Sequence, residues 1–407
     1  MNILFVSDAS IRDIIGGAER VLYEQATGLA RRGHDVHILT RKLPDHKSNQ
    51  EIIQGVREWR YDVDQSNDLS FIISTLLNCK RLFASIQNQY PFDCINFHQP
   101  FSALGVIHFP ASKKIKRIYN CHSLSFEEFR SRNPKPKGVI RRVLYFLNVK
   151  ARKFIERRVL NKSDRIVVLS QFSQEKLWCV YKIPSEKIMV VPGGVDLQQF
   201  YPAADKAEIR QCLNIPQEKV ILFSVRNLVP RMGLKNLIYA IKEVVKAVPD
   251  IYFVLGGKGT LKNDLILLSQ NLGVENHIRF TGFIPEEKLP DYYRSADIFI
   301  LPTLELEGFG LVTLEALASG VPVLGTPIGG TKEILGRLDP KYIFRDTQPE
   351  SMAALIIETC QLFKNNPGLW QDVSSLCRSF VEANYSWEKN VDTMEKIFSE
   401  SWSRSRL

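Results

Sequence analysis

Short apolar runs alternate along this chain with longer stretches in which apolar residues recur every three or four positions. The first 40 residues hold one complete unit: Ile3–Val6 predicts a buried strand, Glu19–Arg31 an amphipathic helix, and Val36–Leu39 a second strand. Gly33 stands where the helix is expected to end. A strand, a helix and a strand with short connections are the unit of a parallel α/β sheet, so the pattern predicts one.

The same pattern occurs in two series. Further strands of the first series are predicted at Asp93–Phe97, Arg117–Cys121, Arg165–Leu169 and Ile188–Val191. The second series starts with a strand and then a helix, and its predicted elements are Lys219–Val225, Leu237–Val248, Tyr252–Leu255, Ile278–Thr281, Ile298–Leu301 and Val321–Leu324. The turn-forming cluster Pro192–Asp196 separates the two series. We therefore expect two doubly wound domains, residues 1–195 and 196–385, with ligands in a cleft beyond the carboxyl ends of the strands.

The composition is that of a globular protein with a sizeable core. Of the 407 residues, 44% are apolar and 24% are charged, which excludes a disordered chain, a coiled coil and a fibre. No apolar run approaches the ~18 residues of a membrane-spanning helix, and Ile3–Val6 ends too early for a secretory signal. The seven cysteines are odd in number and contain no C-x-x-C pair. We therefore expect a reducing cytoplasm rather than a disulfide framework or a zinc site.

The positive charge is concentrated in one segment. Between Lys113 and Arg158 there are 15 Lys or Arg and three Glu, a net charge of +12, so the rest of the chain carries −2 of the total of +10. Around Arg141 and Arg142 the bases lie beside Leu, Tyr and Phe, a pattern typical of an amphipathic helix on an anionic membrane. A solvated basic face stays the alternative. Nucleic-acid binding is not favoured, because no stacking platform accompanies the charge.

The densest motif runs from Glu305 to Gly320, between the predicted strands Ile298–Leu301 and Val321–Leu324. Its glycines let a backbone come close to a ligand. The helix expected to open near Leu311 offers unpaired N–H groups and a positive dipole end, which suit a phosphate. Any α/β protein has glycine-rich turns of this kind, so the glycines alone leave a structural role open.

Two carboxylates in this motif make it specific. Glu307 precedes the expected helix and Glu315 lies about one turn into it, and each can accept two hydrogen bonds from neighbouring hydroxyls, as on a sugar or a ribose. With seven residues between them, inside E-G-F-G-L-V-x-L-E-A-L-A-x-G-x-P-V, they resemble the E-x7-E signature of glycosyltransferase family 4. The resemblance extends over nearly the whole chain, and its other matching segments are Gly16–Gly17, Val191–Asp196, Gly329–Ile334 and Tyr385–Trp387.

This resemblance implies the GT-B fold, with two Rossmann-like domains and a last helix, residues 386–407, that packs back on the first domain. It implies a retaining, metal-independent transferase that uses a nucleoside diphosphate sugar as co-substrate and needs no further cofactor. Glu307 would hold hydroxyls of the donor sugar, and Glu315 those of the ribose. Backbone N–H groups of Phe309, Gly310, Leu311 and Val312 would meet the sugar and the diphosphate, and Gly308 would belong to the same donor site. Gly16 and Gly17 would let the first domain close onto the diphosphate.

Cations for the departing diphosphate are expected after the first strand of the second domain. Relatives carry there an arginine and, directly before a glycine, a lysine. Arg226 matches the arginine, but Met232 occupies the lysine position, so we assign the second cation to Arg231. Fixed positive charge stabilises the negative charge that develops on a leaving phosphate. The alternative for Arg231 is a surface arginine in a loop.

Two histidines follow predicted strands of the first domain. His122 comes directly after Arg117–Cys121, and relatives place a histidine here against the donor sugar, so we expect it to be catalytic. His98 follows Asp93–Phe97, and we consider it for the acceptor side. A structural hydrogen-bonding role is the alternative for both.

Other motifs are set aside. Asp62-Val63-Asp64 has the D-x-D form of a metal site but lies in a polar stretch far from the donor motif, and no metal is expected. Gly256-Gly257-Lys258-Gly259 is not a P-loop, and we expect a turn beside the nucleotide pocket. No G-x-G-x-x-G follows the first strand, which argues against a dehydrogenase.

The sequence thus predicts a cytoplasmic enzyme, peripheral on the inner face of the plasma membrane, that transfers a hexose to an envelope or extracellular polysaccharide or glycolipid. We favour UDP-glucose as the donor. The alternatives are a sugar-nucleotide epimerase of the same fold and an inactive relative that binds glycans or membranes.

Overall fold

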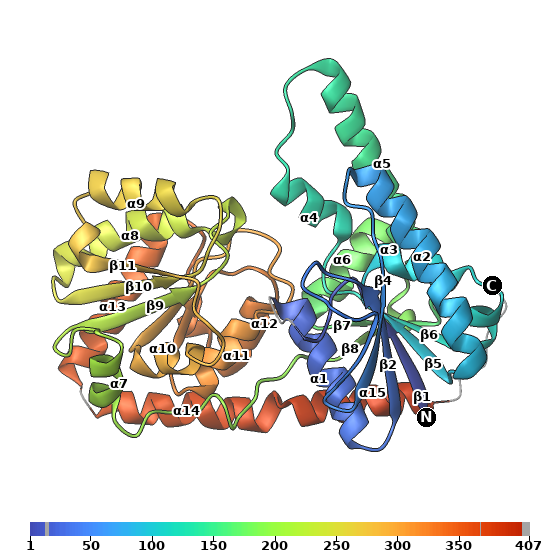
Figure 1. Cartoon of the computed structure of the whole chain (residues 1–407). Helices are drawn as coiled ribbons and strands as arrows, with labels where there is room; N and C mark the ends of the chain where they lie inside the picture. Colours follow the sequence, from blue (N-terminus) through green and yellow to red (C-terminus); the bar gives the residue numbers. More distant parts are fainter. Residues whose placement is uncertain (13–15, 367, 401–407) are drawn as a thin grey trace. The chain divides into compact units, whose positions relative to one another are not determined.

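The structure is a computed structural model that describes residues 1–12, 16–366 and 368–400. The chain forms two compact units. Unit 1 comprises Met1–Gly193 together with the chain from Trp387 onward, and unit 2 comprises Gly194–Ser386. Each unit is built around its own sheet with helices on both faces (Figure 1).

The sheet of unit 1 has the order β3-β4-β2-β1-β5-β6-β7-β8. β3 is antiparallel to β4, and the other pairs in this order are parallel. The strands are β1 (Asn2–Val6), β2 (Asp35–Arg41), β3 (Gln50–Ile53), β4 (Val56–Tyr61), β5 (Cys94–Phe97), β6 (Lys116–Asn120), β7 (Arg165–Val168) and β8 (Ile188–Val190). The helices are α1 (Gly17–Arg31), α2 (Asp68–Gln89), α3 (Pro100–Ile107), α4 (Ser125–Arg132), α5 (Val139–Lys162), α6 (Gln171–Tyr181) and α15 (Trp387–Ser399), with 3-10 turns η1 (Ala111–Lys114) and η2 (Ser185–Lys187).

Alternating side chains of these strands enter two cores. Leu4 and Val6 of β1 pack with residues of α2, α3, α5 and α6, whereas Ile3 and Phe5 pack with residues of α1 and α15. The C-terminal helix α15 lies against α1. Gly28 permits this approach, because a Cβ there would stand 2.7 Å from Cγ2 of Val391.

The sheet of unit 2 has the order β11-β10-β9-β12-β13, with all four pairs parallel. The strands are β9 (Val220–Val225), β10 (Ile251–Gly256), β11 (Ile278–Gly282), β12 (Ile298–Leu301) and β13 (Val323–Gly325). The helices are α7 (Lys206–Cys212), α8 (Leu234–Ala247), α9 (Lys262–Asn271), α10 (Leu289–Ser295), α11 (Leu311–Ala318), α12 (Gly329–Leu338), α13 (Pro349–Asn365) and α14 (Leu369–Asn384), with 3-10 turns η3 (Pro230–Met232), η4 (Glu275–His277) and η5 (Pro340–Tyr342).

The predicted strand–helix alternation is present in both units. The sequence pattern missed β3 and β4, because β4 reads as polar. Its Glu58 and Arg60 side chains are nevertheless fully buried, where they pair with each other. Strands are predicted from runs or alternation of apolar residues, so a strand whose buried positions hold an ion pair is not recognised.

α2 is long and apolar enough, by length and composition alone, to cross a membrane. Its inner face carries the buried residues Cys79, Phe83 and Ile86, which pack in the core of unit 1. This packing explains the apolar composition of that face. The seven cysteines, all within the described residues, are free thiols.

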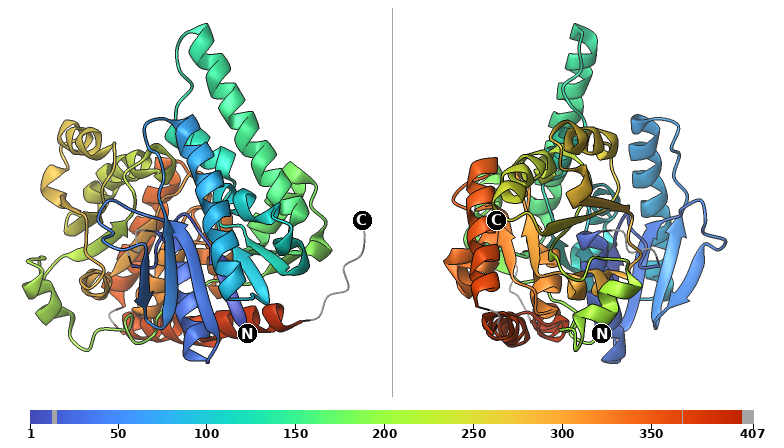
Figure 2. Two further views of the ribbon diagram at one scale, coloured as in Figure 1. Left: turned by 45° about the vertical axis from the view of Figure 1, so that its right-hand side comes forward. Right: turned by 90° about the vertical axis from the view of Figure 1, so that its left-hand side faces the viewer.

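α4 and α5 form an arm that projects beyond the sheet and the neighbouring helices of unit 1 (Figure 2). At its base, the buried carboxylate of Glu156 on α5 accepts hydrogen bonds from the backbone N–H of Ser125 on α4 and from the hydroxyl of Tyr181 on α6. Burial raises the pKa of Glu156 to about 7. The base of the arm is thus held to the rest of unit 1 by a carboxyl group whose burial costs free energy when it is ionised.

Candidate active site

The strand order of unit 2 reverses at β9, whose two neighbours are β10 and β12. In such sheets, ligands bind outside the carboxyl ends of the strands at this reversal. Arg226 directly follows β9, and the segment from Thr303 to Gly310 follows β12. The topology therefore brings the predicted cation and the predicted carboxylate to the same edge of the sheet.

Arg226 and Glu307 are in direct contact. Nη2 of Arg226 donates to Oε2 of Glu307, and it also lies 3.2 Å from Oγ1 of Thr303. The Thr303 hydroxyl donates to the same Glu307 oxygen at 2.9 Å. The Arg226 and Glu307 side chains are 8% and 9% exposed. Burial strengthens this pair relative to one in water.

Met232 lies beneath Arg226, with Sδ 3.0 Å from Nη2 of the guanidinium. Its side chain is buried. The position at which the family resemblance implies a lysine is thus packed against Arg226, where a second positive charge would face the guanidinium.

Arg231 is attached to the loop that carries Glu307. Its backbone carbonyl accepts from the N–H of Leu304 at 2.8 Å, and its Nη1 donates to the carbonyl of Leu306 at 3.3 Å. Gly233, with φ +71°, allows the two loops to pack this closely, because a Cβ there would stand 1.8 Å from the carbonyl oxygen of Pro302. The two loops therefore hold one another in place.

The loop before α11 is conformationally strained. Leu306, next to Glu307, has φ +59°, and this left-handed conformation costs an ordinary residue about 1–2 kcal/mol. Gly329, with φ +60°, lies under the same loop, since a Cβ there would stand 1.9 Å from the carbonyl oxygen of Glu307. That carbonyl accepts from the N–H of Gly330 at 3.0 Å. Strain of this kind collects at functional sites.

α11 begins where the sequence predicted it, at Leu311, after Gly310 with φ +89°. Its first N–H groups have no partner within the helix and give this end a partial positive charge. They belong to the segment predicted to meet sugar and diphosphate. Gly308, Phe309 and Val312 lie within two residues of Gly310 on either side of it.

Glu315 lies on α11 and is partly buried. Its Oε2 accepts from the hydroxyl of Tyr293 on α10 at 2.8 Å. Tyr293 is fully buried, and burial, followed by the nearby Glu315 charge, raises the pKa of its phenol well above the usual value. Tyr293 therefore acts as a donor that holds the Glu315 carboxylate.

The two histidines of unit 1 are in contact with each other. Nε2 of His122, after β6, lies 2.9 Å from Nδ1 of His98, after β5. Burial lowers the pKa of His122 to about 4 and lowers that of His98 well below its usual value. Both rings are therefore neutral near pH 7. His122 is partly exposed, while His98 is buried.

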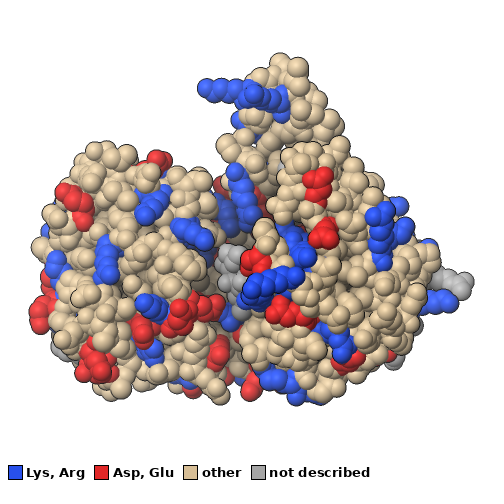
Figure 3. All heavy atoms as spheres, viewed as in Figure 1, with Lys and Arg blue, Asp and Glu red and all other residues tan. Residues whose placement is uncertain are grey.

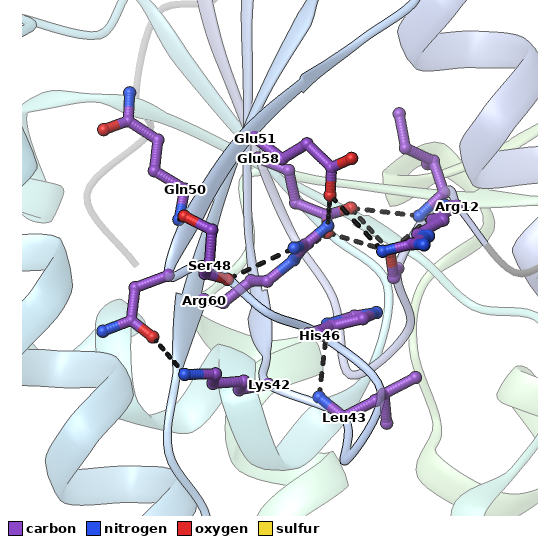
Figure 4. Close-up of polar contacts among 12 residues, drawn as sticks. Arg12, Lys42, Leu43, His46, Ser48, Gln50, Glu51, Glu58 and Arg60 are labelled. Carbon is purple, nitrogen blue, oxygen red and sulfur yellow. Dashed lines mark hydrogen bonds and ion pairs between the residues drawn. The ribbon is translucent and has the colours of Figure 1, made fainter.

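Gly17 is the first residue of α1, and Gly16 precedes it. The loop that leads to them from β1 is held by Glu58 of β4. The carboxylate of Glu58 accepts from Oγ of Ser10 at 2.9 Å and from the N–H of Ile11 at 3.1 Å. Arg60 and Glu51 continue this cluster (Figure 4). Residues 13–15 lie outside the described part of the chain.

Sequence reasoning missed the partners that hold these side chains. Thr303 directly follows a strand and a proline, which is the one available signal for it. Nothing in the sequence points to Tyr293, which lies 22 residues before Glu315. The Asp64 carboxylate caps a turn by accepting from the N–H of Ser66 at 2.9 Å. Among the described residues, no group of three His, Cys, Asp or Glu is arranged to hold a metal ion.

Comparison with known proteins identifies the family. The model of glycosyltransferase family 4 matches residues 15–199, and that of the group 1 glycosyl transferases matches residues 205–366. The chain belongs to glycosyltransferase family 4. It is a retaining GT-B glycosyltransferase, as the motif predicted.

Two curated relatives show how far the similarity extends. A GDP-mannose-dependent alpha-(1-6)-phosphatidylinositol monomannoside mannosyltransferase from Mycolicibacterium smegmatis is 35% identical over 44% of this glycosyltransferase and 48% of the relative, so the match spans about half of each chain. An uncharacterised glycosyltransferase from Methanocaldococcus jannaschii is 25% identical over 96% of this chain and 97% of the relative.

Solved structures share the fold over nearly the full length. Sucrose-phosphate synthase from Thermosynechococcus elongatus matches with a TM-score of 0.79 and 21% identity, over 98% of each chain. HepE from Anabaena, in complex with UDP and glucose, matches with a TM-score of 0.75 and 18% identity, over 98% of this chain and 99% of the other. The GT-B fold, including the contact of α15 with α1, is thus confirmed for this glycosyltransferase.

Proposed function

We propose that this glycosyltransferase moves a hexose from a nucleoside diphosphate sugar to a hydroxyl of an envelope or extracellular polysaccharide or glycolipid. The observation that carries the proposal is the buried contact of Arg226 with Glu307 beside the start of α11. A cation, a carboxylate and the N-terminus of a helix at one edge of the sheet match the diphosphate and the hydroxyls of such a donor.

In this proposal, Arg226 and Arg231 stabilise the negative charge that develops on the departing phosphate. Glu307 binds hydroxyls of the sugar, and Glu315, held by Tyr293, binds those of the ribose. The bond between the anomeric carbon and the phosphate oxygen breaks, and the acceptor oxygen bonds to the same face of that carbon. The acceptor proton passes to the leaving phosphate. No side chain is assigned as a covalent nucleophile.

Unit 1 contributes further groups. We assign Gly16 and Gly17, at the N-terminus of α1, to the diphosphate, and His122 to the donor sugar. Support for these roles comes from their positions. His98, Gly16 and Gly17 belong to the connections that follow β5 and β1, the two strands at which the strand order of this sheet reverses. His122 follows β6, the neighbour of β5.

We favour UDP-glucose as the donor. The solved structure with UDP and glucose shares the whole fold, but its identity of 18% is too low to transfer the ligand. The relative with 35% identity uses GDP-mannose. A thermal-shift screen with UDP-glucose and GDP-mannose distinguishes the two donors.

An anionic membrane is the proposed location of the acceptor, and the arm formed by α4 and α5 is the proposed contact. Residues 129–155 include nine Lys or Arg and no Asp or Glu. Large apolar side chains at the start of α5 are exposed, among them Val139 at 79%, Ile140 at 77% and Leu144 at 60%. Figure 3 shows basic side chains at the free end of the arm. Surface helices that bind anionic lipid typically insert apolar side chains into the membrane and surround them with basic residues.

The test is the release of nucleoside diphosphate with and without an added acceptor, after thermal-shift selection among UDP-, GDP- and ADP-sugars. A transferase releases nucleotide faster when the acceptor is present. Consumption of UDP-N-acetylglucosamine without an acceptor would identify an epimerase instead. Membrane or glycan binding with no donor binding would identify the inactive alternative.

A further inference from the structure

A series of hydrogen-bonded, buried polar side chains runs through unit 1 from a backbone carbonyl to His122. Nδ2 of Asn390, on α15, donates to the carbonyl of Pro192 at 2.7 Å. Nε2 of Gln25, on α1, donates to Oδ1 of Asn390 at 3.0 Å. Gln25 and Asn390 are almost fully buried, at 0% and 2% exposure, beside the apolar residues that pack between the sheet, α1 and α15. Polar groups in such a place need a reason to be there.

The hydrogen-bonded series continues to the two histidines. Nδ2 of Asn120, at the end of β6, donates to Oε1 of Gln25 at 2.7 Å and lies 3.3 Å from Nε2 of His98. Nδ1 of His98 lies 2.9 Å from Nε2 of His122. α1, α15, β6 and the segment after β5 therefore each supply one member.

The direction of every hydrogen bond in this chain follows from its first acceptor. A proline carbonyl can only accept, so the Asn390 amide nitrogen must face it and the Asn390 oxygen must face Gln25. Gln25 then donates to Asn390 and presents its oxygen to Asn120. Reversing any one amide would place two acceptors or two donors opposite each other.

The same logic fixes the protons of the two imidazoles. The second N–H of the Asn120 amide points to Nε2 of His98, which must accept, so neutral His98 carries its proton on Nδ1. That proton is donated to Nε2 of His122, so neutral His122 carries its proton on its own Nδ1. The lowered pKa of each ring agrees with the neutral state at pH 7.

We propose that Asn390, Gln25, Asn120 and His98 form a relay that holds His122 in the Nδ1–H tautomer and so makes it a hydrogen-bond donor to the donor sugar. The first part rests on the contacts in unit 1, and the second rests on the proposed function. The four residues are positioning residues: they act through His122, because the hydrogen bond at one imidazole nitrogen decides which nitrogen keeps the proton.

The relay is tested directly by ¹⁵N NMR of the full chain, labelled at histidine, at pH 7. We expect His122 and His98 both as Nδ1–H tautomers. A wild-type His122 with its proton on Nε2 would overturn the relay, whatever the activity of the enzyme. The His122→Ala and His98→Asn variants assign the signals among the seven histidines.

His98→Asn and His98→Leu are a matched pair of similar size, and they differ in the polar amide. Asn can keep a donor opposite Nε2 of His122, so we expect the Nδ1–H tautomer and at least a third of kcat to remain. Leu removes the donor, so we expect the Nε2–H tautomer of His122 to appear and kcat to fall about tenfold, with UDP affinity unchanged. An Nδ1–H tautomer that is fully retained in His98→Leu would contradict the relay.

Two further readouts separate the relay from the proposed function. Asn390→Leu removes the hydrogen bonds at the far end of the relay, so we expect His122 to show both tautomers. A melting curve shows that this variant still folds. If this variant does not fold, the wild-type spectrum and His98→Asn still decide the tautomer. Unchanged transfer in His122→Ala would remove the role of His122 toward the sugar and leave the relay itself standing.

Discussion

The guanidinium of Arg226 donates to the carboxylate of Glu307, and both side chains are more than nine-tenths buried in the loops after β9 and β12. The sequence assigned these residues to different parts of the donor, the diphosphate and the sugar. From this contact we expect an exchange, in which a bound diphosphate pairs with Arg226 and leaves Glu307 to bind sugar hydroxyls. This exchange leads to the first prediction.

Glu307→Ala should abolish transfer and leave UDP binding largely intact. The unpaired Arg226 should lower the free energy of unfolding of the unliganded protein by about 3 kcal/mol. Because the diphosphate no longer competes with a carboxylate for Arg226, UDP should bind this variant at least as tightly as the wild type and stabilise it at least as much. Calorimetry and melting curves with UDP measure both effects. Loss of UDP affinity as large as the loss of transfer would contradict the role given to Glu307.

Glu315→Ala should weaken binding of the nucleoside diphosphate by about 1.5–3 kcal/mol, the contribution of hydrogen bonds to a charged group. Tyr293→Phe is the matched control, since it removes the hydroxyl that holds Glu315 and keeps the carboxylate. We expect a smaller loss of affinity for it. Calorimetry with UDP, or with the diphosphate chosen by the screen, measures both. Unchanged affinity in Glu315→Ala would remove its role at the ribose.

Arg231→Ala should weaken nucleoside diphosphate binding about tenfold, because a charge-assisted contact to the diphosphate is lost. Arg345→Ala is the control: this arginine is also in unit 2, its side chain is 84% exposed, and it pairs with the adjacent Asp346. We expect no change for it. Equal affinities of the two variants would return Arg231 to the role of a loop arginine.

The arm should bind anionic vesicles through both charge and apolar contact. Replacing Arg141 and Arg142 together by Ala should weaken binding to phosphatidylserine-containing vesicles by about 2 kcal/mol at low salt, near 1 kcal/mol for each base. Replacing Lys80 and Arg81, an adjacent basic pair on α2, should have little effect. Sedimentation measures the bound fraction, and absence of wild-type binding at low salt would end the membrane proposal.

The buried Glu156 predicts a pH dependence of stability. Its pKa of about 7 in the folded protein exceeds its ordinary value of 4.5, so the folded state holds the proton more tightly than the unfolded state does. The stability from the neutral carboxyl is therefore complete below about pH 4.5 and is lost as the pH rises through about 7. Urea unfolding at pH 5.5 and 8 should show a loss of about 2 kcal/mol in the wild type and not in Glu156→Gln. Parallel curves for the two proteins would contradict it.

Much of the fold followed from local patterns in the sequence. Buried parallel strands such as β1 and β12 are continuous apolar runs, and the helices between them carry apolar residues at helical spacing, so each element is recognisable by itself. The start of α11 was predicted at the residue where the structure places it, because glycines before an apolar run are a strong local signal. The E-x7-E pair was visible for the same reason, since both carboxylates lie on one short segment.

What the sequence could not reveal are contacts between elements that lie far apart along the chain. Arg226 meets Glu307 across 81 positions, and Gln25 meets Asn390 across 365. Such pairs leave no periodicity, because their partners are set by how the sheets are ordered and where helices return. The sequence alone determined the strands, the helices and the residue types at the donor motif. The tertiary structure decided which of these side chains touch, because the free energy of a buried polar group depends on the partner that folding brings to it.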